Sequence, residues 1–168
     1  MTVQQKRPVL SLPLSNFEML IEIAAIAGVL LVLAITAIYW QALPDRVPAH
    51  FGLAGEPNRW AGKSQALLLP ILASVMYVGM TILCRYPHIY NYPVPLTEEN
   101  AERQYRIGRM LISSMRAETV WVAAFIQREM IRLGLGKADG ISIWAFPAMV
   151  AIVVATAGVG IYKSYRAR

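Results

Sequence analysis

Long uncharged apolar stretches constrain this chain more than any other feature. Residues 23–40 carry no charged side chain, and neither do residues 64–84 and 141–162. A helix rises 1.5 Å per residue, so about 20 apolar residues cross a hydrocarbon core about 30 Å thick. We therefore predict an all-α polytopic membrane protein, in which the bilayer is the main partner.

The composition agrees with this prediction and excludes a nucleic-acid partner. Hydrophobic residues make up 57% of the chain and charged residues 15%, whereas a soluble domain has about 25% charged residues. The net charge of +6 would suggest nucleic acid in a soluble domain. Here the basic residues lie at the ends of the apolar stretches, where anionic lipid headgroups are the natural partner.

Three of the predicted membrane helices follow directly from apolar length: residues 17–40, 64–84 and 141–162. The first is expected to be a retained helix and not a cleaved signal peptide, because Trp40 occupies a position that needs a small residue. Pro70 lies inside the second, so we expect a kink near its outer end.

A third helix in chain order, residues 110–133, is ambiguous because it includes charged residues, among them Arg116, Glu118, Arg128 and Glu129. Alone, it could lie flat at the membrane surface. With four crossings, nine basic residues lie on the same side of the membrane as the termini: Lys6, Arg7, Arg85, Arg103, Arg106, Arg109, Lys163, Arg166 and Arg168. Six lie on the opposite side: Arg46, Arg59, Lys63, Arg128, Arg132 and Lys137.

This asymmetry favours four crossings with both termini in the cytoplasm, since cytoplasmic loops carry the excess of Lys and Arg. We predict a single membrane domain over residues 1–168 in a bacterial plasma membrane. Whether residues 110–133 cross fully rests on this charge count alone.

Arg116 and Glu118 form a candidate functional pair of intramembrane charges, because charge at membrane depth is costly and marks functional sites. A structural ion pair is the alternative, with Glu22 or Glu118 as the partner of Arg116. Residues two apart do not share a helix face. At least one of the two must therefore face another helix, a partner subunit or the surface.

The loop over residues 41–63 separates the first two helices and faces outward in this topology. Its three prolines and three glycines exclude a continuous helix. Residues 55–58, Gly-Glu-Pro-Asn, are typical of a tight turn. Trp40 and Trp60 suit the membrane interface. We expect a short ordered cap on the bundle.

This loop resembles the N-terminal module of SdpI-like membrane proteins, an uncharacterised bacterial membrane domain. The resemblance is carried by Leu43-Pro44, Val47-Pro48, His50-Phe51, Gly55-Glu56-Pro57, Arg59-Trp60 and Lys63, and it covers residues 26–84 and, more loosely, 98–136. Asn58 stands where the family often has Asp. In the best-known members a second membrane module follows, which we do not expect here, and those proteins act in toxin immunity and signalling.

The resemblance makes the loop the candidate ligand-binding site, and the residues expected to contribute are Pro48, His50, Gly55, Glu56, Pro57, Arg59 and Lys63. His50 could instead bond to backbone carbonyls, or bind a metal with Asp45 and Glu56, although the spacing matches no metal signature. Glu56, Arg59 and Lys63 could equally pair with one another and fix the loop.

No pattern in the chain indicates catalysis: a nucleophile with its base, a Gly-rich phosphate loop, HExxH and CxxC are all missing from the sequence. Glu98 and Glu99 are expected to cap a helix that begins near Thr97. We predict a non-enzymatic protein without cofactor or metal that binds an extracytoplasmic ligand such as a toxin peptide. The alternative function is an accessory subunit of a membrane complex, and a third is a small transporter. The chain could also form a homo-oligomer.

Overall fold

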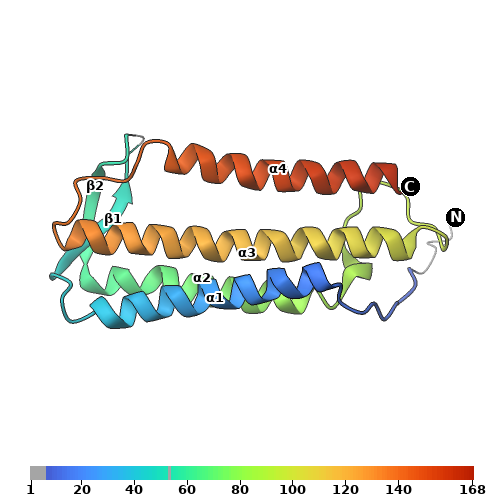
Figure 1. Cartoon of the computed structure of the whole chain (residues 1–168), viewed down its shortest axis with the longest axis horizontal. Helices are drawn as coiled ribbons and strands as arrows, with labels where there is room; N and C mark the ends of the chain where they lie inside the picture. The colour runs from blue at the N-terminus through green and yellow to red at the C-terminus, as the bar shows by residue number, and fades with distance from the viewer. Residues whose placement is uncertain (1–6, 53) are drawn as a thin grey trace, which may run out of the picture.

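Four long helices run side by side in the computed structural model, which describes residues 7–52 and 54–168 (Figure 1). They are α1 (Asn16–Tyr39), α2 (Leu68–Leu83), α3 (Ala101–Gly134) and α4 (Ala145–Arg166). Two strands, β1 (Arg46–Phe51) and β2 (Pro57–Gly62), form an antiparallel hairpin at one end of the bundle. Short 3-10 helices, η1 (Lys63–Leu67) and η2 (Pro87–Ile89), precede and follow α2.

Three of these helices are long and apolar enough to span a membrane: α1, α2 together with η1, and α4. Their outer faces expose large aliphatic and aromatic side chains, among them Leu20, Ile23, Leu30, Ile38, Ile71, Val75, Val78, Phe146, Ile152 and Val154. A water-soluble surface rarely carries contiguous apolar patches of this extent. The chain is therefore a membrane protein, as its sequence predicts.

Helix α3, the least apolar of the four, lies at the centre. It packs against α1 and α2 on one side and against α4 on the other (Figure 1). Its buried side chains include many polar ones: Gln104, Arg109, Ser113, Arg116, Gln127 and Glu129. Enclosure by apolar helices keeps these groups away from lipid, where unpaired charge is costly.

The start of α3 differs from both sequence expectations. The helix begins at Ala101, earlier than the membrane segment predicted from residue 110, and Asn100 is its N-cap. Thr97 and Asn100 each accept a bond from the other's backbone N–H, which forms a turn before the helix. Glu98 and Glu99 lie in this turn and do not cap the helix; a hydrogen bond with Thr97 lowers the pKa of Glu99.

The other helix bounds are also shifted. Pro70 occupies the first turn of α2, where its missing N–H leaves no helical hydrogen bond unmade. The proline lies where the 3-10 helix η1 gives way to α2, so the helix geometry changes near the outer end of the segment, where the kink was expected. Helix α4 begins at Ala145 instead of residue 141, because residue 141 is used in a contact with the hairpin.

The connection between α2 and α3 is held by tyrosines. Tyr90 donates its hydroxyl to the carbonyl of Leu83 at 2.9 Å, and Tyr92 donates to the carbonyl of Pro87 at 2.8 Å. Burial raises the pKa of both phenols, so they remain protonated donors. A Cβ on Gly108 would come within 3.0 Å of both rings, so a glycine at this position lets α3 approach them.

Helices α1 and α3 approach each other closely at Gly28. A Cβ built there would lie 2.8 Å from Val120 Cγ1 and 3.3 Å from Trp121 Nε1. The Trp121 indole donates to the carbonyl of Ala24 at 3.0 Å. Small residues allow such backbone approach between membrane helices, where packing and hydrogen bonds drive association.

Gly28→Leu is expected to destabilise the bundle by about 1–3 kcal/mol, the usual cost of overpacking a close contact. The matched control is Gly79→Leu, because a Cβ at Gly79 in α2 meets nothing within 4 Å. The measurement is the free energy of unfolding in mixed micelles titrated with a denaturing detergent. Equal stability of the two variants would show that the close α1–α3 contact is not formed.

Candidate functional site

The predicted ligand-binding loop is built on the β1–β2 hairpin. Strand residues pair in antiparallel register, with Pro48 opposite Trp60 and His50 opposite Arg59, and the register shifts on both sides of His50. The chain reverses between Gly52 and Gly55, whose N–H donates to the Gly52 carbonyl at 3.0 Å. The tight turn thus ends at Gly55 instead of starting there, and residues 57 and 58 belong to β2.

Gly55 fastens the hairpin to the segment between α3 and α4. Its carbonyl accepts the N–H of Ile141 at 2.8 Å, and its φ of +86° is readily available only to glycine. A Cβ at Gly55 would lie 2.0 Å from the Ile141 carbonyl oxygen. Both its backbone angle and its surroundings therefore require glycine.

Buried residues before and within β1 pack on the bundle. Leu43 and Val47 form a buried cluster with Met130 and Ile131 of α3. Pro48 is also completely buried. These apolar contacts hold the hairpin against the end of α3, so Pro48 and Gly55 have structural positions within the predicted site.

The polar members of the predicted site lie mainly at exposed positions of the hairpin. His50 Nδ1 lies 2.7 Å from Asn58 Oδ1, with the imidazole donating to the amide oxygen. Asn58, Arg59 and Trp60 are consecutive exposed residues of β2. Lys63 lies apart from them, because its Nζ stacks 5.2 Å from the centre of the Trp40 ring.

The structure decides between some of the alternatives for this loop. His50 contacts a side-chain amide instead of a backbone carbonyl. Within residues 7–52 and 54–168, no ion pair joins Glu56, Arg59 and Lys63. The same residues hold no cluster of three His, Cys, Asp or Glu side chains able to bind a metal. Glu56 follows the turn, and its carbonyl accepts the N–H of Gly52 at 2.8 Å, while Pro57 is the first residue of β2 and pairs with Phe51.

A second polar region lies inside the bundle, where α3 meets α1. Arg109 is 5% exposed and Glu18 is 4% exposed, so both are buried. Arg109 Nε donates to Glu18 Oε1 at 2.6 Å, and a second guanidinium nitrogen donates to Oε2 at 3.0 Å. The remaining Arg109 donors bind the carbonyls of Leu12 and Pro13 at 2.7 and 2.9 Å. This bidentate pair fixes the start of α1 against α3.

Arg116, one of the two predicted intramembrane charges, pairs with Glu22 of α1. Its guanidinium also donates to Thr81 Oγ1 of α2 at 2.7 Å and lies 5.3 Å from the centre of the Tyr77 ring. The Tyr77 hydroxyl donates to the other Glu22 oxygen. Three helices therefore meet at this charge, and Glu22 is one of the two partners considered from the sequence.

Glu118, the other predicted charge, faces the opposite side of α3 and accepts a hydrogen bond from Thr156 of α4. Its Oε2 is buried without a hydrogen-bond partner among the described residues. The two charges thus point to different helices, as their spacing requires.

Deeper in the bundle, Gln127 Nε2 donates to Thr36 Oγ1 at 2.8 Å.

Sequence reasoning missed the Glu18–Arg109 pair. It placed Arg109 among the nine basic residues on the side of the termini and did not consider Glu18 as its partner. No sequence pattern pointed to the pair. In the structure, Glu18 to Arg109 and Thr36 to Gln127 are both 91 residues apart, as expected for two parallel helices in one register.

A cavity of about 430 Å³ adjoins these pairs at the end of the bundle that carries the termini. Polar and charged side chains from α1, α2 and α3 line it together with the chain before α1: Ser11, Glu18, Glu22, Thr81, Arg85, Arg109, Ser113 and Arg116. Its charges are largely neutralised by the two ion pairs. The cavity therefore belongs to the structural polar region.

The comparisons with known proteins fall on the same part of the chain. Residues 27–73 match DUF1648, a domain of unknown function. The match spans most of α1, the hairpin and the first turns of α2, where the predicted ligand-binding residues lie. Through this segment the chain is similar to a family whose activity is undefined.

A relative of this chain is an uncharacterized protein from Archaeoglobus fulgidus. The two are 30% identical over 104 residues, which cover 54% of this chain and 56% of the archaeal protein. The chain thus spans about half the length of that relative. No solved structure matches this chain.

Proposed function

We propose that this chain is a non-enzymatic membrane protein that binds an extracytoplasmic ligand through the β1–β2 hairpin, in the manner of SdpI-like immunity and signalling proteins. The observation that carries the proposal is that the hairpin is held in place and yet exposes part of β2. Leu43 and Val47 pack on α3, and Gly55 is hydrogen-bonded to Ile141. Three consecutive residues of β2 are exposed: Asn58, Arg59 and Trp60. A fixed platform with exposed polar and aromatic side chains is suited to recognition.

The proposed topology has α3 as a fourth crossing helix in a bacterial plasma membrane, with cytoplasmic termini. Support comes from the position of α3, which runs alongside the three apolar helices (Figure 1). Its charges at Arg109 and Arg116 are paired inside the bundle. The hairpin and the α3–α4 connection then face outward together.

The proposed ligand is a peptide with acidic and aromatic or aliphatic side chains. Arg and Trp are enriched among the residues that dominate protein interfaces, and Arg59 and Trp60 are adjacent on β2. Arg59 forms no ion pair within the part of the chain that the structure describes. An acidic group on the ligand would find Arg59 free to pair.

The alternative of an accessory subunit was motivated in part by the charged third helix. In that hypothesis Arg116 and Glu118 would meet a helix of a partner protein. Arg116 instead contacts Glu22, Thr81 and Tyr77, and Glu118 contacts Thr156. Ligand recognition at the hairpin is therefore the better-supported proposal.

The test uses cells that lack the gene and carry plasmid copies, challenged with a panel of secreted toxin peptides. The wild-type chain is expected to protect against at least one peptide, and Arg59→Ala with Trp60→Ala to abolish that protection at an equal membrane level. Arg103→Ala is the control for lost charge, since Arg103 is exposed on α3 at the other end. Unchanged sensitivity across the panel, or full protection by the hairpin variant, would contradict the proposal.

A further inference from the structure

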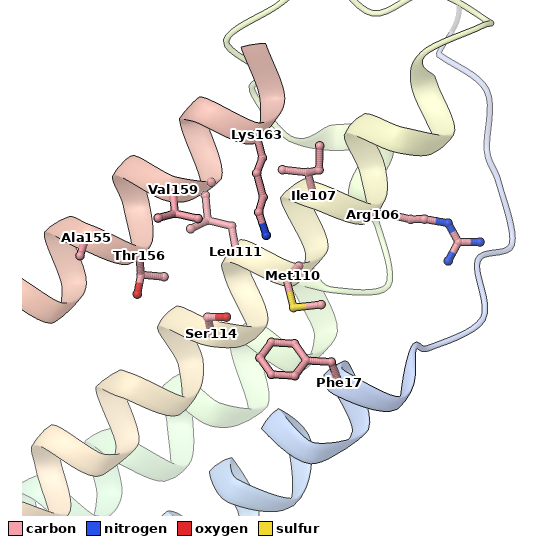
Figure 2. A pocket seen from close by; sticks show the side chains of 11 residues that line it. Phe17, Arg106, Ile107, Met110, Leu111, Ser114, Ala155, Thr156, Val159 and Lys163 are labelled. Atoms are coloured by element: carbon pink, nitrogen blue, oxygen red, sulfur yellow. The ribbon is translucent and has the colours of Figure 1, made fainter. Parts of the chain in front are cut away.

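A groove lies between α3 and α4. It has a volume of about 490 Å³ and opens beside the first turn of α1 (Figure 2). Its walls are mainly apolar, with Phe17, Ile107, Met110, Leu111, Ala155, Val159 and Gly160 among the lining residues. The volume lies in the range of small-molecule sites in proteins, about 300–1,000 Å³.

Two polar contacts between α3 and α4 flank the groove and hold the helices at a fixed separation. At the end with the termini, Gln104 Nε2 donates to the carbonyls of Ser164 and Ala167 at 2.9 and 3.1 Å. Farther along α3, Glu118 accepts the hydroxyl of Thr156. These contacts fix the distance between α3 and α4, so the groove between them is a feature of the packed structure.

Helix α4 lines the groove from Ala155 to Lys163. At 1.5 Å per residue this stretch is about 12 Å long, close to half of a hydrocarbon core of about 30 Å. The groove thus extends over most of one membrane leaflet, with Lys163 near the end of α4 and Ala155 toward the bilayer centre. Its neighbouring surfaces, including Ile152 and Val154, are exposed and apolar.

Lys163 is the cation that this groove offers. Figure 2 shows its side chain running from α4 toward α3 along the groove, whereas Arg106 points away from α4. Arg106 is also engaged by Glu102 at 2.9 Å. Within the described residues, no carboxylate forms an ion pair with Lys163.

We infer that this groove binds one anionic phospholipid, with an acyl chain between α3 and α4 and the headgroup phosphate on Lys163. Charge and depth both support this occupant. An unpaired ammonium stands at the headgroup level, and an apolar slot of one-leaflet length lies directly below it. The inference is independent of the proposed recognition function of the hairpin.

The test measures lipid binding to the full chain in detergent by native mass spectrometry. The probes are phosphatidylglycerol and phosphatidylcholine with the same acyl chains. The wild-type chain is expected to bind one phosphatidylglycerol in preference. Lys163→Gln is expected to reduce that preference about five-fold, from a contribution of about 1 kcal/mol per basic residue near an anionic lipid surface. Arg103→Gln removes the same charge at the same end, outside the groove, and is expected to leave the preference unchanged.

A second pair of variants tests the slot. Ala155→Phe fills the groove and is expected to weaken binding of both lipids, whereas Ala151→Phe lies one turn away on α4, outside the lining residues, and is expected to have no effect. Equal effects of Lys163→Gln and Arg103→Gln, or of the two Phe variants, would overturn the inference. A lipid-free dimer that Ala155→Phe dissociates would overturn it too, since a second copy would then occupy the groove.

Discussion

Arg109→Met is expected to lower the free energy of unfolding by about 3–5 kcal/mol, the usual cost of leaving one member of a buried ion pair unpaired. The substitution leaves the Glu18 carboxylate enclosed at 4% exposure without its guanidinium partner. It also removes the donors to the Leu12 and Pro13 carbonyls. The measurement is unfolding in mixed micelles at increasing denaturing detergent.

Two further variants make this result specific. Arg103→Met removes an exposed arginine from the same helix and is expected to change stability by no more than about 0.5 kcal/mol. Glu18→Gln combined with Arg109→Met is expected to recover part of the loss, since no charge is then left unpaired. If Arg109→Met is no worse than Arg103→Met, the ion pair is not buried in the native protein.

Gly55→Val is expected to free the hairpin from the α3–α4 connection. The positive φ at position 55 costs a branched residue about 1–3 kcal/mol. A Cβ at this position would also lie 2.0 Å from the Ile141 carbonyl oxygen, a backbone atom that has little room to move. The expected result is faster trypsin cleavage after Arg59 in membranes and loss of any ligand binding by the hairpin.

Gly62→Val is the matched control within the same hairpin. A Cβ at Gly62 would have Ser64 Oγ at 4.0 Å as its nearest neighbour, and the backbone there has φ of −61°. We expect its trypsin cleavage to match the wild-type rate. Equal protection of the Gly55 and Gly62 variants would mean that the Gly55–Ile141 contact does not hold the hairpin.

The sequence predicted the apolar helices well because their signal is local. An uncharged stretch of membrane length needs no knowledge of its neighbours, so α1, α2 and α4 were each expected within a few residues of their bounds. The prolines and glycines in residues 41–63 likewise excluded a helix there. Strand pairing was not predicted, because the register of β1 and β2 depends on packing against α3.

The polar interior could be predicted only in part, because pairing partners are distant in the chain. Arg116 was identified as a costly charge, and Glu22 was one of its candidate partners. The roles of Thr81 and Tyr77 depend on how α2 turns toward α3, which spacing within one helix does not reveal. Which residues of the hairpin are buried could not be predicted either, because the burial of Pro48 and Gly55 depends on packing between distant parts of the chain.

The central claim is that α3 crosses the membrane inside the bundle, so that the hairpin and the α3–α4 connection lie on the same outer side. Single cysteines at exposed positions test it directly, in a background with Cys84→Ala: Asn58→Cys in β2, Glu98→Cys before α3 and Asp139→Cys after it. Intact cells are treated with a membrane-impermeant maleimide. The account predicts labelling at positions 58 and 139, and labelling at position 98 only after permeabilisation. Labelling of position 139 together with 98, and not with 58, would contradict it.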